Sequence, residues 1–178
     1  MNWKLKASIQ NAVSLLPSRL SYDAYYFIQR YFGNLRKQNP ASRLQAGIGI
    51  VDRIYKQNQS IVSKTFLEVG TGHSLNLPIA LWLSGASKVI TVDLNPYLKP
   101  ELVFEDITYI RNNLHKIMVL FGTYVELPFF QERLNQLISW NGYSITDLLG
   151  AMNISYLAPG RCYTAKYSNS CDRLSYFL

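Results

Sequence analysis

Residues 65–76 read TFLEVGTGHSLN, and this stretch decides the interpretation of the fold. A run of residues typical of β-strands leads into Glu68, and two glycines, Gly70 and Gly72, follow one residue apart. The pattern predicts a short strand over residues 64–69 that ends in a tight turn. The chain therefore places a carboxylate two residues before a glycine turn, at the carboxyl end of a strand.

A helix and a second strand follow this turn. Leu77–Leu83 is apolar and predicted to be helical, with Asn76 as its cap, and Gly85 is placed to end it. Lys88–Asp93 reads KVITVD and predicts the next strand. A strand–helix–strand unit of this length implies parallel strands joined by a right-handed crossover. Ligands of such sheets bind at the carboxyl ends of the strands, where the glycine turn and Asp93 both fall.

The acid before the glycines discriminates between two classes of cofactor. A nicotinamide cofactor brings a pyrophosphate to the first glycine turn, and a carboxylate at Glu68 would repel it. S-adenosylmethionine brings an ammonium and a sulfonium and has no phosphate, so an acid at the strand end suits it. Gly70 and Gly72 allow close approach of the backbone, and Asp93 can accept hydrogen bonds from both ribose hydroxyls.

These residues carry a family resemblance. Glu68-Val-Gly70-Thr-Gly72, with Asp93 after Val-Ile-Thr-Val, resembles the first two motifs of Rossmann-like S-adenosylmethionine-dependent methyltransferases. The resemblance implies that Glu68 lies by the methionine amino group, Asp93 holds the ribose and Leu94 packs near the adenine. The glycine loop would line the cofactor. The cofactor-binding residues implied in this way are Glu68, Gly70, Thr71, Gly72, Asp93 and Leu94.

The same resemblance implies an α/β fold, a Rossmann-like three-layer sandwich with a mostly parallel sheet. Ile154–Ala158 is the expected third strand, and Ser175–Leu178 would open a fourth beside the first. Relatives continue to seven strands, so the sheet is expected to be incomplete, with about four strands, and to lack most of the acceptor half. An open sheet edge of this kind predicts self-association.

Two positions depart from the family pattern. Ser74 stands where many members have a third glycine, and Pro159 follows the third strand where many members have an acid near the adenine. Between the second and third strands, residues 101–150 form a long helical insertion, with Ser144 as a cap near its end. This insertion is expected either to cover the sheet or to form one wall of an acceptor pocket.

The N-terminal segment, residues 1–63, is basic and predicted to be helical, and residues 64–178 form the partial cofactor-binding domain. Residues 1–64 carry ten Lys or Arg and two acids, whereas residues 65–178 carry eight and nine. Three amphipathic stretches precede the first strand, the second of them capped by Ser21. They are interpreted as a lid or cap over the domain. Nucleic acid is not the expected partner, although the basic charge leaves it open.

The composition of the chain limits the classes of protein to which it can belong. The chain of 178 residues is 48% hydrophobic and 16% charged, which is typical of one globular domain. No apolar run approaches the roughly 20 residues that span a bilayer, and no signal peptide is apparent, so a cytoplasmic location is predicted. Cys162, Cys171, His73 and His115 are isolated from one another, so no metal site is predicted.

The function expected from the sequence is that of an S-adenosylmethionine-dependent methyltransferase acting on an unknown, small-molecule acceptor. No catalytic base is assigned, because a lone loop histidine such as His73 more often bonds to backbone. One alternative is an NAD-dependent oxidoreductase, which Glu68 and the absence of a glycine at Leu75 disfavour. The other alternative is a non-catalytic binding protein derived from a methyltransferase.

Overall fold

The computed structural model describes residues 7, 8, 11, 13, 15, 17–33, 35, 39–159 and 161–163. The chain divides into two compact units, Met1–Asn39 and Pro40–Leu178. The division falls before α3 (Pro40–Lys56), which packs against α4 (Asn76–Leu83) in the second unit. The sequence had grouped this helix with the basic N-terminal segment, but its apolar face belongs to the core of the sheet-containing unit.

In the first unit the main element is α2 (Ser18–Tyr31). It begins three residues before Ser21, whose amide donates to the carbonyl of Pro17, so the prediction that Ser21 caps this helix is wrong. Proline before the first helical residue supplies the extended backbone instead. Most of the first predicted amphipathic stretch lies outside the described residues.

Across the part of the chain that is described, no helix combines the length and apolarity needed to span a bilayer.

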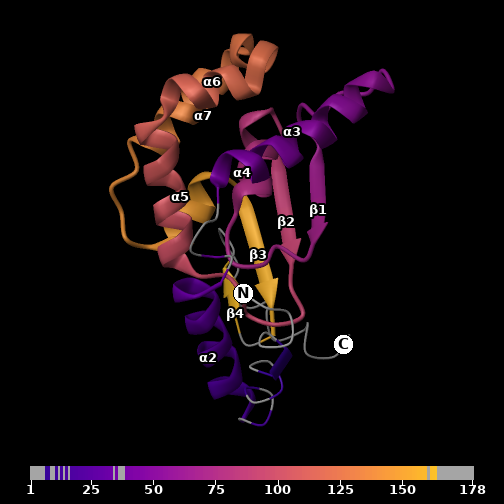
Figure 1. Ribbon diagram of the computed structural model, residues 1–178. Helices are drawn as coiled ribbons and strands as arrows, with labels where there is room; N and C mark the ends of the chain where they lie inside the picture. Colours follow the sequence, from indigo (N-terminus) through magenta and orange to yellow (C-terminus); the bar gives the residue numbers. More distant parts are fainter. Residues whose placement is uncertain are drawn as a thin grey trace. The chain divides into compact units, whose positions relative to one another are not determined.

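The second unit is built on a small sheet (Figure 1). Its strands are β1 (Thr65–Val69), β2 (Lys88–Val92), β3 (Ile154–Ala158) and β4 (Arg161–Tyr163). The strand order is β1-β2-β3-β4, and the first three strands are parallel. The fold is therefore α/β, with a small parallel sheet that is compatible with a Rossmann-like arrangement.

The fourth strand differs from the one expected. β4 pairs antiparallel with β3 through a tight connection, whereas the sequence placed the fourth strand beside β1. The segment predicted for that strand, Ser175–Leu178, lies outside the described residues. A chain that reverses directly after Ala158 can only form an antiparallel neighbour, because a parallel one needs a longer crossover. Among the described strands, β1 has a single neighbour, β2.

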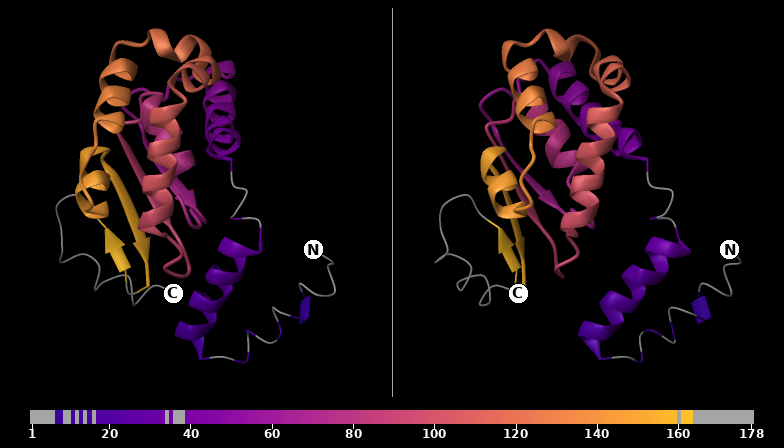
Figure 2. Two further views of the ribbon diagram at one scale, coloured as in Figure 1. Left: turned by 60° about the vertical axis from the view of Figure 1, so that its left-hand side comes forward. Right: turned by 90° about the vertical axis from the view of Figure 1, so that its left-hand side faces the viewer.

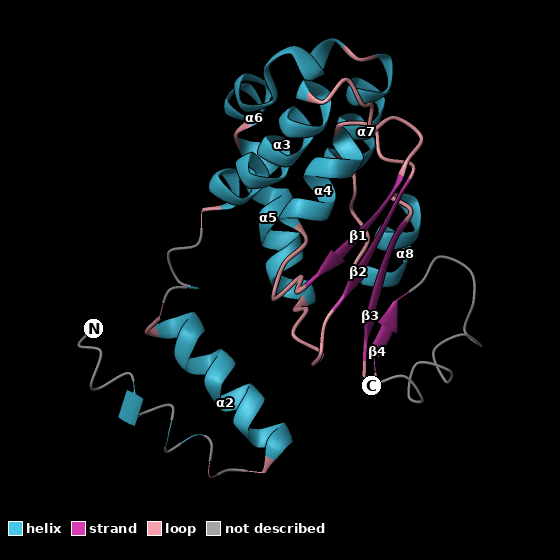
Figure 3. Ribbon diagram, turned by 90° about the vertical axis from the view of Figure 1, so that its right-hand side faces the viewer, coloured by secondary structure: helices cyan, strands magenta, loops and turns pink. Residues whose placement is uncertain are grey.

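Three helices cover one side of the sheet: α3, α4 and α5 (Pro100–Asn112), as Figure 3 shows. Every residue of α4 except Leu77 is buried, as expected for a helix enclosed on all sides. The close approach of α3 to α4 requires Gly47, because a Cβ atom there would lie 2.6 Å from the Cβ of Ala80. The strand–helix–strand unit predicted from the sequence is present.

The insertion between β2 and β3 is helical, as predicted. After α5 it forms α6 (Leu114–Phe121), a 3-10 turn (Gly122–Glu126), α7 (Pro128–Ile138) and α8 (Ile145–Ala151). Figures 1 and 2 place α6 and α7 toward the amino ends of the strands. α8 packs against β3. The predicted cap of α8 is confirmed, because the hydroxyl of Ser144 accepts a hydrogen bond from the Asp147 amide at 3.2 Å.

The strand register places two layers of side chains beneath the helices. Phe66 on β1, Val89 on β2 and Ile154 on β3 are in register and form an apolar layer. Two residues nearer the carboxyl ends, Glu68 aligns with Thr91 and Thr91 with Tyr156, which gives a polar layer. The sheet thus changes from apolar to polar as it approaches the edge where the glycine loop begins.

Candidate functional site

The glycine loop starts where β1 ends, directly beside the end of β2. The amide of Gly70 donates to the carbonyl of Val92 at 2.8 Å, which extends the parallel ladder by one bond. This bond holds the first loop residue against the strand that leads into Asp93. The sequence and the register therefore bring the loop and Asp93 to the same carboxyl edge, the edge at which α/β sheets bind ligands.

The loop has a conformation that only glycine adopts without strain. Gly70 has φ 90° and Gly72 has φ 73°, both in the region that L-residues rarely occupy. A Cβ atom built on either residue would meet no heavy atom within 4 Å. The space beside both glycines is therefore open, and the backbone can approach a bound molecule there.

Asp93 organises the loop from the end of β2. Its side chain is buried, and its carboxylate accepts a hydrogen bond from the Gly72 amide, at 3.2 Å to Oδ2 and 3.4 Å to Oδ1. Burial raises the pKa of Asp93, while the bonds from the Gly72 amide and the Tyr156 hydroxyl oppose the rise. A cation beside this carboxylate would favour its charged form.

Glu68 is half-buried on the polar layer of the sheet. The hydroxyl of Thr91 donates to Glu68 Oε2 at 2.7 Å, and Thr71, which is buried, is hydrogen-bonded to the same Thr91 hydroxyl. Since the Thr91 proton points to the carboxylate, the Thr71 hydroxyl is the donor in the second bond. Burial raises the pKa of Glu68; the Thr91 bond opposes this rise and the nearby Asp93 carboxylate adds to it.

The segment after Asp93 is tied back to the glycine loop. The Tyr156 hydroxyl accepts from the amide of Leu98 and lies within hydrogen-bond distance of the carbonyl of Asn95, each at 3.3 Å. His73 Nδ1 lies 2.8 Å from the carbonyl of Tyr97, so the neutral ring carries its proton on Nδ1 and donates it there. Burial lowers the pKa of His73, which keeps the ring neutral. His73 thus bonds to backbone, as a structural histidine does.

A second polar cluster lies where α4 and α5 meet. The Asn76 side-chain amide donates to Asp106 Oδ2 at 2.7 Å and to the Ser74 hydroxyl at 2.9 Å. Burial raises the pKa of Asp106 from 3.8 to about 6, against the bonds from Asn76 and Ser74 and the charge of Arg43. Asn76 Oδ1 is one of the buried polar atoms that lack a partner across the described side chains.

This cluster corrects one prediction and supplies residues that the sequence reasoning missed. Asn76 is the first residue of α4 and does not cap it; its side chain is directed to Asp106 instead. Asp106 had a visible signal, because it falls on the buried face of α5, four residues from Leu102 on one side and from Ile110 on the other. No signal in the sequence pointed to Arg43, because its charge acts on Glu68 and Asp106 only once α3 is packed in the fold.

The structure brings together most of the residues that the sequence assigned to a cofactor. Glu68 near the end of β1 and Asp93 directly after β2 lie at one edge of the sheet, with the glycine loop and Thr71 between them. Leu94 follows Asp93 but leaves 71% of its side chain exposed, so it packs on no described neighbour to any great extent. Across the described residues, no three His, Cys, Asp or Glu side chains are grouped as metal ligands.

This edge carries two carboxylates, and the positive charge of Arg43 has the smallest influence of the causes that act on Glu68. Glu68 and Asp93 both have their pKa raised by burial, which means that each carboxylate is held in surroundings that disfavour its charge. A cationic ligand would relieve this cost, whereas a phosphate would add to it.

No family model, curated protein or solved structure matches the chain in three comparisons with known proteins.

Proposed function

We propose that this chain binds S-adenosylmethionine and is a methyltransferase, or the cofactor-binding part of one, with a small-molecule acceptor. The observation that carries the proposal is the pair of carboxylates, Glu68 and Asp93, that flank an open loop of two positive-φ glycines. We also propose that the α/β fold is a Rossmann-like sandwich. Such sheets bind ligands at the carboxyl ends of their strands, where Glu68 and Asp93 lie, and this supports the same assignment.

Charge is the main argument for this cofactor over a nicotinamide. One opposite charge at about 4 Å is worth roughly 4 kcal/mol at an effective dielectric near 20. S-adenosylmethionine offers two cationic groups, and an ammonium near Glu68 would offset the burial that raises its pKa. A pyrophosphate in the same place would meet Glu68 and Asp93 with the same sign of charge.

The residues present fit the parts of the cofactor. Asp93 uses its carboxylate for the Gly72 amide, but an ionised carboxylate offers about four acceptor positions and so keeps capacity for ribose hydroxyls. The open space beside Gly70 and Gly72 suits close approach by the ligand. Leu94, being exposed, can cover an adenine ring. The cofactor supplies the electrophilic methyl group, and the residues of this chain bind and orient it.

The test is calorimetric titration of the protein with S-adenosylhomocysteine and with NAD. We expect saturable binding of the first and none of the second. Asp93→Ala should weaken S-adenosylhomocysteine by about 1–3 kcal/mol, because the ribose hydroxyls lose a charged acceptor. Asp93→Asn keeps the shape and one acceptor, so it should lose less.

Gly70→Val examines the loop itself. A valine there is strained by the positive φ and places its side chain in the open space, so binding should be lost. Gly49→Val is the matched control, because Gly49 also faces open space but lies in α3 and has no positive φ. Binding of NAD in preference to S-adenosylhomocysteine, or normal binding by a folded Gly70→Val variant, would overturn the proposal.

A further inference from the structure

An exposed apolar stripe runs along α2, the 14-residue main helix of the first unit. Leu20 is 59% exposed, and Phe27 and Tyr31 are each 55% exposed. Successive residues of a helix are about 100° apart, so the two rings, seven and eleven residues after Leu20, lie within about 20° of its direction around the axis. The three side chains therefore form one line along the helix.

The aromatic part of this stripe is continuous. The rings of Phe27 and Tyr31, one turn apart, have their centroids 4.5 Å apart and their planes tilted by 43°. Phe32, directly after the last helical residue, is 72% exposed and adds a further ring at the end of the helix. Apolar side chains that are exposed as a contiguous group, and not singly, are typical of an interaction surface.

The unit that carries the stripe is also strongly basic. Residues 1–39 contain six Lys or Arg and one acid, Asp23, whereas residues 40–178 contain twelve Lys or Arg and ten acids. The first unit therefore holds +5 of the net charge of +7 of the whole chain. Any pairing of Asp23 with a basic residue is already counted in this total. The surface thus combines apolar side chains with an excess of positive charge.

We propose that α2 docks on the surface of an anionic lipid bilayer, with the stripe inserted among the headgroups. A helix with one apolar side lies in the plane of such a surface, and its binding combines burial of that side with attraction between basic residues and anionic lipids. Tyrosine suits this boundary, because its ring is apolar and its hydroxyl can reach water. The inference does not depend on the cofactor proposed for the glycine loop.

Other occupants account for only one of the two properties. A nucleic acid would neutralise the basic charge, but it would leave Leu20 without an apolar environment. A second copy of α2 would cover the stripe, but it would bring together two units that each carry a net charge of +5. An anionic bilayer offers apolar surroundings and the opposite charge at the same place.

The experiment measures sedimentation of the full chain with two kinds of vesicle, phosphatidylcholine alone and phosphatidylcholine with about one third phosphatidylserine. We expect binding to the anionic vesicles to be at least about tenfold tighter. This preference should be lost in about 1 M salt, where the Debye length is only about 3 Å. Equal binding to the two kinds of vesicle at low salt, or binding to neither, would overturn the proposal.

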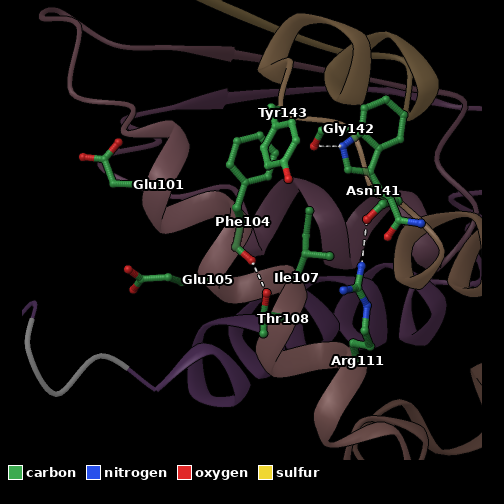
Figure 4. A pocket seen from close by; sticks show the side chains of 10 residues that line it. Glu101, Phe104, Glu105, Ile107, Thr108, Arg111, Asn141, Gly142 and Tyr143 are labelled. Atoms are coloured by element: carbon green, nitrogen blue, oxygen red, sulfur yellow. Dashed lines mark hydrogen bonds between the residues drawn. The ribbon is translucent and has the colours of Figure 1, made fainter.

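Phe27→Ser and Tyr31→Ser test whether the stripe makes the contact. Each should weaken binding to the anionic vesicles about tenfold, because a small polar side chain replaces an inserted ring. Both rings are more than half exposed, so both variants should fold. Tyr143→Ser is the matched control, because Tyr143 lies beside the pocket of the second unit shown in Figure 4 and is 95% exposed. Equal binding by Tyr31→Ser and Tyr143→Ser would exclude α2 as the docking surface.

Insertion is detected by tryptophan fluorescence in anionic vesicles with brominated acyl chains. Phe27→Trp should add emission that the bromine atoms quench, whereas Tyr143→Trp should add emission that they do not quench. Equal quenching of the two added signals would overturn the proposal. Tighter binding to a DNA oligonucleotide than to vesicles, unchanged by Phe27→Ser, would overturn it in favour of nucleic acid. Self-association that Phe27→Ser abolishes would overturn it in favour of a second copy.

Discussion

The two faces of the sheet differ in what covers them. On the face beneath α3, α4 and α5, Val89 and Tyr156 are fully buried and Glu68 is half-buried. On the other face of β1, Leu67 is 68% and Val69 is 79% exposed. Because apolar residues of β1 point to both faces, the pattern of apolar and polar residues along this strand does not show which face is buried.

This difference shows that burial beneath the helices, and not the composition of the strands, raises the pKa values of the carboxylates at the site. The carboxylates with raised pKa, Glu68, Asp93 and Asp106, are all associated with the covered side, and burial is the largest cause of each shift. The uncovered face of β1 (the open face) has apolar side chains in water and no carboxylate with a raised pKa among its described residues; farther along the same side of the sheet, α8 packs against β3. The helices therefore supply stability and the electrostatic setting of the site at the same time.

The largest change in stability on the covered side is expected from Asp106→Asn. A pKa raised from 3.8 to about 6 corresponds to a cost of up to about 3 kcal/mol when the acid is ionised in the folded state. The variant should therefore raise the free energy of unfolding above pH 6. An amide at this position also offers a donor near the buried Asn76 Oδ1, which lacks a partner.

The pH dependence gives this prediction its sign. Between pH 3.8 and about 6 the folded state keeps the Asp106 proton that the unfolded state loses, so this acid lowers stability as pH rises. The gain from Asp106→Asn should thus be small near pH 4 and full above pH 6, as measured by urea unfolding at each pH. A variant less stable than the parent at pH 8 would show that ionised Asp106 stabilises the fold.

The next test makes one chemical change on each face. Val89→Ala, at a side chain with no exposure, should lower the free energy of unfolding by about 2 kcal/mol, because two buried methyl groups are lost. Val69→Ala, at a side chain 79% exposed, should lower it by less than about 0.5 kcal/mol. Chemical denaturation measures both. Equal losses would mean that the open face is covered in solution.

Ser144→Ala is expected to have a smaller effect than Val89→Ala. The Ser144 hydroxyl accepts from the Asp147 amide, and losing such a cap costs about 1 kcal/mol. Because α8 packs against β3 and β4, the two strands farthest from β1 in the sheet, the affinity for S-adenosylhomocysteine should not change. Calorimetry and urea unfolding on the same sample separate the two effects, and a loss of affinity without a loss of stability would connect α8 to the site.

Local signals were enough to predict the central unit. The strand before Glu68, the buried helix, the strand before Asp93 and the cap at Ser144 follow from β-propensity, apolar runs and capping chemistry within a few residues. The parallel pairing of the first two strands follows from the length of the crossover between them. Such features depend on neighbours in the chain and can be derived from sequence.

The features that were missed depend on contacts between distant residues. The partner of Asn76 is Asp106, 30 residues away, so a side chain that looked like a cap proved to be part of a buried network. The return of β4 onto β3 depends on a turn whose direction the sequence did not indicate. The influence of Arg43 on the acids requires the packing of α3 on α4. Sequence patterns specify faces, but they do not specify which faces meet.

The smallest effect on stability, and the most direct test of the open face, is Val69→Lys. Among the described strands β1 is paired only by β2, and its exposed Leu67 and Val69 lie beside that unpaired edge. A strand edge with apolar neighbours pairs readily with another chain, and a lysine there prevents it. We therefore expect the parent protein to self-associate with rising concentration and the variant to do so less. The stability of the monomer should change by less than about 0.5 kcal/mol.

Light scattering across a range of concentrations measures this association. Val119→Lys is the matched control, because Val119 is 67% exposed but lies on α6, away from the sheet edge. If association proceeds through β1, only the Val69 variant will lower the average mass. Equal effects of both lysines would indicate that added charge alone prevents association. A parent protein that stays monomeric at all concentrations would mean that the edge of β1 is covered, and the contrast between the two faces would then not persist in solution.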